Sequence, residues 1–187
     1  MKREYYYLIS SLPWLCLGEK PKCNSVAFLA LCQEHLTPVR LEQLEAVTLY
    51  PNKKSCCSVE RSRQVWETCL RNGLTRLRAA ALEVESAPWL QEEADVFPND
   101  ARRIEEICAD ANPARRERGL DELRWQHLDS LAVGHEFDFD ALVIYRLHLL
   151  LAEKWADLSA EQGQNNMRSL AEAGIQQAEN KRSTIES

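Results

Sequence analysis

Cysteine and histidine are the residue types in this chain most able to do chemistry, because they supply thiolates, metal ligands and proton carriers near neutral pH. The seven cysteines are Cys16, Cys23, Cys32, Cys56, Cys57, Cys69 and Cys108. Their spacing contains no C-x-x-C pair of a structural zinc site and is unlike a dense disulfide scaffold. The adjacent pair Cys56-Cys57 has no histidine or further cysteine nearby in sequence, so we interpret it as inert. We therefore expect reduced thiols in a cytoplasmic protein.

The histidines and the known catalytic motifs give no sign of an active site. His148 falls on the apolar side of a helical pattern, which favours a core histidine over a ligand, and His127 and His135 show no ligand spacing. The chain lacks the motifs of phosphate loops, dinucleotide sites, hydrolase nucleophiles, zinc proteases and di-iron bundles. We therefore expect no enzyme, no cofactor and no metal. An enzyme with a site assembled from distant residues is the third-ranked alternative.

A small basic cluster could bind phosphate, but its surroundings argue against that. Arg115, Arg116 and Arg118 are interleaved with Glu117 and followed by further acidic residues, so a solvated helix start is favoured. The whole chain carries a net charge of −6, whereas nucleic-acid binders usually present a dominant basic field. We expect protein partners and no nucleic acid.

Trp125 is the strongest candidate for a partner contact. At 100° per residue it lies on the side opposite Leu120 and Leu131, so its helix carries apolar residues on two faces. One face could bind a partner, or the helix could be sandwiched inside the domain, and the sequence leaves both open. The predicted partner-binding residues are Trp125, Arg124, Asp121, Asp129, Arg115 and Arg116.

The elements that would position these residues are helices. The chain has 26 Leu and 20 Ala against 9 Val and 6 Ile, and Leu and Ala favour helices over strands. Cap-plus-proline pairs at Thr37-Pro38 and Asn112-Pro113 are typical helix starts. Other predicted caps are Ser25, Asn99, Asp138 and Ser159, the last opening a final polar helix. We predict an all-α, compact bundle of about seven or eight helices.

The helix predicted from Phe139 to Leu158 is apolar nearly all round, with Arg146, Glu153 and Asp157 on one strip. This pattern is typical of a central core helix. It falls short of the ~20 apolar residues needed to span a bilayer. We expect this helix to be the most buried element and the chain not to cross a membrane.

The charge pattern suggests two helical units. Residues from Lys53 to Arg78 carry a balance of +5, and those from Glu83 to Asp95 carry −5. An acidic segment bracketed by prolines is a candidate hinge. We predict an N-terminal helical unit, a connector, a C-terminal helical unit and a frayed tail at 1–87, 88–98, 99–177 and 178–187.

Two stretches carry a resemblance to a known family. One is YYYLISSLP, from Tyr5 to Pro13. The other is a series of pieces: Asn112-Pro113, Leu120-Asp121, Arg124-Trp125, Leu128-Asp129, Phe137–Asp140, Tyr145–Leu149, Lys154-Trp155 and Glu161–Gly163. Together they resemble an uncharacterised bacterial family encoded among the subunits of V/A-type ATPases. That family is in turn similar to the C-type (d-type) central-stalk subunit.

The resemblance implies a non-catalytic, all-helical subunit or assembly factor between the rotating central stalk and the membrane ring. It implies stalk or ring subunits as partners, and a cytoplasmic location peripheral to the inner membrane through a complex. The C-type subunit is about twice as long and built from repeated units, and the region from Lys20 to Asp110 diverges here. The alternative is a free-standing helical adaptor unrelated to the ATPase.

Overall fold

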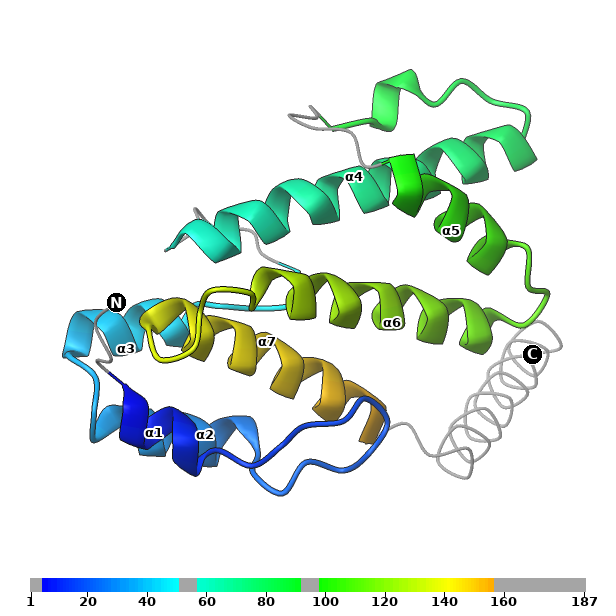
Figure 1. The fold of residues 1–187 in the computed structure, drawn as a ribbon. Helices are drawn as coiled ribbons and strands as arrows, with labels where there is room; N and C mark the ends of the chain where they lie inside the picture. The colour runs from blue at the N-terminus through cyan, green and yellow to red at the C-terminus, as the bar shows by residue number, and fades with distance from the viewer. Residues whose placement is uncertain (1–4, 51–56, 92–97, 157–187) are drawn as a thin grey trace, which may run out of the picture.

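The chain folds into a layered arrangement of helices (Figure 1). The computed structural model describes residues 5–50, 57–91 and 98–156. Its elements are α1 (Tyr6–Ser11), α2 (Ser25–Gln33), α3 (Pro38–Glu45), α4 (Ser58–Ala81), the short 3-10 turn η1 (Ala87–Trp89), α5 (Pro98–Cys108), α6 (Pro113–Leu131) and α7 (Phe139–Ala156). Within those three ranges there is no strand, and 70% of the residues are helical. The all-α prediction is confirmed; the helix predicted from Ser159 lies outside the described residues.

The helix starts follow local side-chain chemistry. The Thr37 hydroxyl and the Asn112 side chain accept hydrogen bonds from backbone N–H groups of the first turns of α3 and α6, as predicted. The Asp138 carboxylate caps α7 by accepting from the Ala141 N–H at 3.0 Å. These caps satisfy N–H groups that have no partner inside the helix.

Two predicted caps were misplaced. Asn24 caps α2, and Ser25 is its first helical residue. Ser25 instead donates from its N–H and its hydroxyl to the Glu153 carboxylate of α7, so the true partner lies far away in sequence. Asn99 lies inside α5, which begins at Pro98; proline suits a first helical position because it has no N–H to leave unpaired.

Helix α7 lies at the centre of the bundle, as predicted. It packs against α2, α3, α4 and α6 (Figure 1). Nine of its 18 residues are buried, compared with eight of 24 in α4. Arg146, placed on the polar strip by the sequence pattern, is only 7% exposed. Its guanidinium donates to the carbonyl oxygens of Glu45, the last residue of α3, and of Val47 just after it. This pairing offsets part of the cost of burying a charge.

The two predicted helical units share their hydrophobic cores. One core cluster joins α1, α2 and α3 to α6 and α7. The other joins α4 to α5 and α6 through buried residues that include Trp66, Leu70 and Ile104. Helix α4 also contacts α7 directly. Residues 92–97 of the predicted connector lie outside the described residues, so its role as a hinge stays a prediction.

No helix in the three described ranges is both long enough and apolar enough to cross a membrane.

Candidate functional site

The structure places the six predicted partner-binding residues in three settings along α6. Asp121 and Arg124 lie in a buried charge network, and Trp125 and Asp129 line an open pocket. Arg115 and Arg116 lie in the first turn of the helix, where Arg115 is exposed and approaches Asp110 at 3.9 Å and Arg116 is half-buried. The network and the pocket are therefore neighbours on one helix. The network joins helices inside the fold, whereas the pocket opens to solvent.

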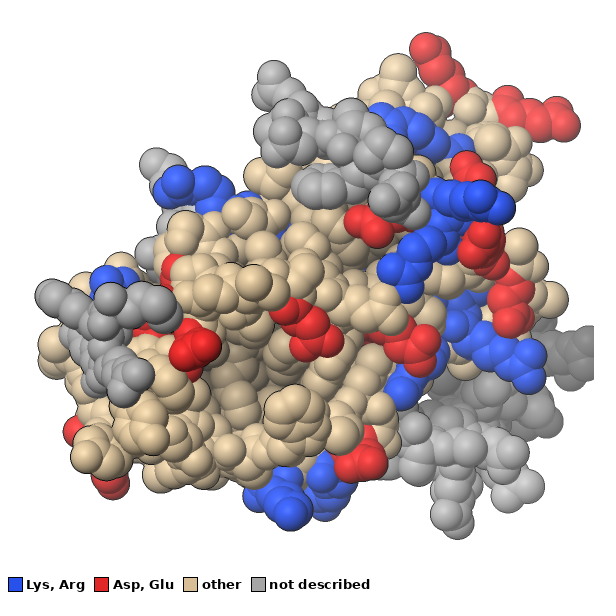
Figure 2. Space-filling model, viewed as in Figure 1, with Lys and Arg blue, Asp and Glu red and all other residues tan. Residues whose placement is uncertain are grey.

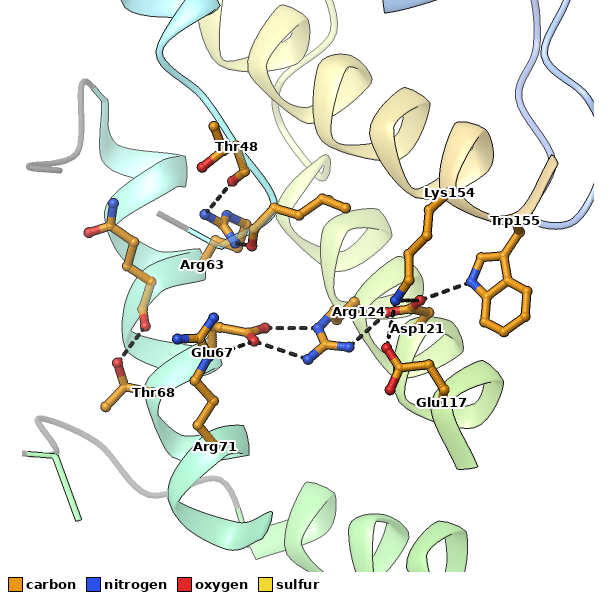
Figure 3. Close-up of polar contacts among 12 residues, drawn as sticks. Thr48, Arg63, Glu67, Thr68, Arg71, Glu117, Asp121, Arg124, Lys154 and Trp155 are labelled. Atoms are coloured by element: carbon orange, nitrogen blue, oxygen red, sulfur yellow. Dashed lines mark hydrogen bonds and ion pairs between the residues drawn. The ribbon is translucent and has the colours of Figure 1, made fainter. Parts of the chain in front are cut away.

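Asp121 is the centre of the charge network (Figure 3). Its side chain is fully buried. One carboxylate oxygen accepts from Arg124 Nη1 at 2.7 Å, and the other accepts from Lys154 Nζ at 2.6 Å and Trp155 Nε1 at 2.9 Å. Three donors on a buried carboxylate offset the cost of removing it from water. Asp121 thus joins α6 to α7.

Glu67 extends the network to α4 (Figure 3). Its two oxygens accept from Nε and Nη2 of Arg124, both at 3.0 Å. This two-point pairing is the geometry in which arginine and carboxylate bind most strongly. Arg71, one turn along α4, donates to the same carboxylate at 3.1 Å. Burial alone would lower the pKa of Arg124, but the hydrogen bond and charge of Glu67 raise it above its usual value.

Lys154 completes the charge balance. Its Nζ also contacts Glu117 at 2.6 Å. Burial would lower the pKa of Lys154, but its hydrogen bonds to Asp121 and Glu117 raise it above the usual value. The network therefore pairs three carboxylates with three cations: Glu67, Glu117 and Asp121 with Arg71, Arg124 and Lys154. It holds α4, α6 and α7 in one register, and a role for Asp121 and Arg124 in partner binding stays a prediction.

The buried charged residues of α4, of which Glu67 belongs to the network, were missed from the sequence. Glu60, Arg63 and Glu67 recur three and four residues apart beside the apolar stripe, and all three are buried. Charges at helical spacing next to a core stripe are the signal that could have found them. Arg63 donates to the carbonyl oxygens of Thr48 and Leu49, so it fixes the segment after α3 (Figure 3).

An open pocket of about 650 Å³ lies between α1, α6 and α7. Its walls are mostly apolar: Ile9 of α1, the following residues Leu12 to Leu15, Trp125 and Ala132 from the α6 side, and Ala141, Ile144 and Tyr145 of α7. Trp14 stands at this pocket with 87% of its surface exposed. Figure 2 shows acidic side chains along the side of the hollow that α6 forms. The pocket thus combines an apolar lining with carboxylates.

Trp125 has a double role in this pocket. It packs partly against the main core, and its ring lies 4.3 Å from that of His148. It also lines the open pocket. The alternative of a helix sandwiched inside the domain holds only in part, because α1 and the residues that follow it cover α6 incompletely on this side. The alternative of a partner contact stays a prediction. Trp125 is half-buried rather than wholly exposed or wholly internal.

Three histidines, two of which line the pocket, contact other side chains of the protein. The side chain of His148 is 12% exposed, and its Nε2 lies 3.4 Å from both Asp129 Oδ1 and the Trp125 carbonyl oxygen. Burial lowers its pKa, although the charge of Asp129 and that backbone contact act in the other direction. His135 lies 2.7 Å from Asp138. His127 stacks on Trp66 across α4 and α6, with ring centroids 4.3 Å apart.

Several polar groups lie among the apolar residues that line the pocket. They include a His–Asp pair, His148 and Asp129, but no serine, threonine, cysteine or lysine that could act as a nucleophile beside it. The Tyr145 hydroxyl donates to the Pro13 carbonyl oxygen, and burial raises its pKa to about 12. In the described parts of the chain no group of three or more histidine, cysteine, aspartate or glutamate side chains could hold a metal. None of the described cysteines forms a disulfide with another, and Cys56 lies outside the described residues.

Part of the chain matches a family model. Residues 90–176 match the model of a family described as a protein of unknown function, DUF2764. No curated protein and no solved structure matches the chain. The matched stretch contains α5, α6 and α7, and therefore Asp121, Trp125 and the α6 and α7 walls of the pocket.

Proposed function

We propose that this chain is a non-catalytic helical subunit or assembly factor of a bacterial V/A-type ATPase, and that it binds a partner protein through the pocket lined by Trp125. The observation that carries the docking part is the pocket itself. Apolar lining and an exposed tryptophan at one place are typical of surfaces that another protein covers.

The resemblance to the family encoded with V/A-type ATPases supports the choice of partner. Several of the short motifs that carry it fall at the pocket and the network: Arg124-Trp125 and Leu128-Asp129 on α6, and Tyr145–Leu149 and Lys154-Trp155 on α7. Four of these motif residues, Trp125, Asp129, Tyr145 and His148, line the pocket proposed to dock. Stalk or ring subunits are the partners that follow.

The buried network supports a mechanical rather than a catalytic role. A subunit between a rotating stalk and a membrane ring must transmit torque without bending, and it needs no active site. The Glu67–Arg124–Asp121–Lys154 chain of contacts crosses three helices at distances of 2.6 to 3.0 Å. Removing one partner from such a buried array is costly, so the three helices resist separation.

Co-purification tests this proposal. Tagged central-stalk subunits are expressed with this chain, and the captured material is assayed for the chain in near-stoichiometric amount. Ala132→Trp, which fills the pocket, should abolish capture. Its neighbour Val133 is 82% exposed and is not among the pocket residues, so Val133→Trp should leave capture intact. Melting curves show whether each variant is folded.

The free-standing adaptor is the outcome that would replace the ATPase assignment. An unrelated protein with a suitable apolar segment would fit the same pocket. Failure of stalk and ring subunits to retain the wild-type chain would overturn the ATPase part of the proposal.

A further inference from the structure

This inference rests on the proposed docking function and concerns the chemistry of the docked segment. We infer that the pocket between α1, α6 and α7 accepts a protein segment that presents an apolar side chain flanked by lysine or arginine. The lining of the pocket is mostly apolar, carboxylates lie at its edge, and its described residues include no lysine or arginine.

The interior of the pocket selects an apolar anchor. Its volume of about 650 Å³ falls in the range of roughly 300–1,000 Å³ typical of binding pockets. The aliphatic and aromatic side chains of Ile9, Leu12, Ile144 and Trp125 face it. An inserted leucine or aromatic side chain would lose water contact where it meets these walls, and such burial is the main source of binding free energy for apolar anchors.

The edge of the pocket selects positive charge. The side chain of Asp129 is 61% exposed, and Glu136 is exposed as well. No lysine or arginine occurs among the described residues that line the pocket. Two carboxylates beside an apolar cavity attract a basic segment and repel an acidic one, so they decide which segments bind.

The histidines do not cancel these carboxylates. His148 is the histidine next to Asp129, and burial lowers its pKa, so at neutral pH it leaves the Asp129 charge in place. His135 contacts Asp138 at 2.7 Å and Asp140 at 3.8 Å, so its ring is directed to other carboxylates. The edge therefore stays acidic at neutral pH.

Two synthetic peptides test the inference. Each forms an amphipathic helix of about five turns (~18 residues) with leucine on one face. One carries lysine on the other face, and its matched partner carries glutamate at the same positions. Binding is followed by the indole N–H signals of a ¹⁵N-labelled full-length chain, which report each tryptophan separately.

The tryptophans supply internal controls. The lysine peptide should shift the signals of Trp14 and Trp125, which line the pocket, and should saturate. The signals of Trp66 and Trp155 should not move, because these indoles donate inside the protein to Asp100 at 2.7 Å and Asp121 at 2.9 Å. The glutamate peptide should shift none of them.

Charge variants show whether the edge carboxylates cause the selectivity. Asp129→Asn combined with Glu136→Gln should raise the Kd of the lysine peptide by about threefold to tenfold, as expected for two solvent-exposed charges. Glu122→Gln changes an exposed carboxylate of α6 outside the pocket and should leave the Kd unchanged.

Three results would overturn the inference. Equal binding of the two peptides would mean that apolar contact alone governs the pocket. Shifts only at Trp89, or no shifts, would place binding elsewhere or nowhere. Shifts of Trp14 and Trp125 on simple dilution of the chain would identify a second copy as the occupant. The co-purification with stalk subunits does not depend on these peptide results. If only the peptide experiment fails, this inference is wrong; if only the co-purification fails, the ATPase proposal is wrong.

Discussion

Replacing Asp121 tests the claim that the buried network holds the three long helices together. The Asp121→Ala change removes a fully buried carboxylate that accepts hydrogen bonds from Arg124, Lys154 and Trp155. Arg124 keeps Glu67, and Lys154 keeps Glu117. Each cation therefore loses part of its compensation rather than all of it.

The expected loss of unfolding free energy is about 3 kcal/mol. Breaking a buried ion pair from one side costs about 3–5 kcal/mol, and the remaining partners favour the lower end of that range. Alanine regains a few tenths of a kcal/mol, roughly, from its better helix propensity. The matched control is the next residue: Glu122 is half-exposed and contacts Arg118 at 3.0 Å. Glu122→Ala should cost about 0.5 kcal/mol, the usual size of a surface pair.

Urea unfolding followed by far-UV circular dichroism measures both variants. With a typical slope of about 1–3 kcal/mol per molar urea, a 3 kcal/mol loss moves the midpoint by about 1 to 3 M. The control should move it by no more than about 0.5 M. Equal, small shifts for both variants would refute the account of the network, because they would mean that Asp121 is no more important than a surface carboxylate.

Three further changes address other parts of the fold. Burial lowers the pKa of His127 to about 4, against the charges of Asp100 and Glu67, so the folded state disfavours its protonated form. Stability should fall as the pH drops from about 6.5 towards 4, and His127→Phe should reduce that fall by about 1–3 kcal/mol in urea titrations at several pH values. Gly134 has a φ of +91° with open space around it. Gly134→Ala should therefore cost about 1 kcal/mol through backbone strain alone, a loss that thermal melting detects. Trp125 is half-buried, so Trp125→Ala should cost about 2 kcal/mol in the same melts, below the 3–5 kcal/mol typical of a fully internal tryptophan.

Local features were predictable from the sequence. The starts of α3 and α6 depend on residues within one turn, such as Thr37-Pro38 and Asn112-Pro113, and both predictions were confirmed. The central position of α7 followed from its nearly continuous apolar surface. The cap of α2 was misplaced because Ser25 binds Glu153, 128 residues away. Rules for helix caps use only neighbouring residues, so they do not predict this contact.

The candidate site was predictable only in part. The sequence identified Trp125 as lying off the main apolar stripe, and the structure shows the pocket on that side. The pairing of Arg124 with Glu67 joins residues 57 positions apart, and it depends on the rotation of α4 against α6. The sequence pattern placed Arg146 on the polar strip of its helix. Its burial was not predictable, because its partners are backbone carbonyls, which every residue type has.

The most direct test of the docking claim compares two exposed tryptophans. Trp14 lies at the pocket and is 87% exposed, whereas Trp89 is 60% exposed and does not line it. Calorimetry measures the Kd of the chain for a purified central-stalk subcomplex. If the pocket docks the partner, Trp14→Ala raises the Kd at least about tenfold without changing the melting temperature, and Trp89→Ala leaves both unchanged. Equal Kd values for the wild-type chain and Trp14→Ala would contradict the account.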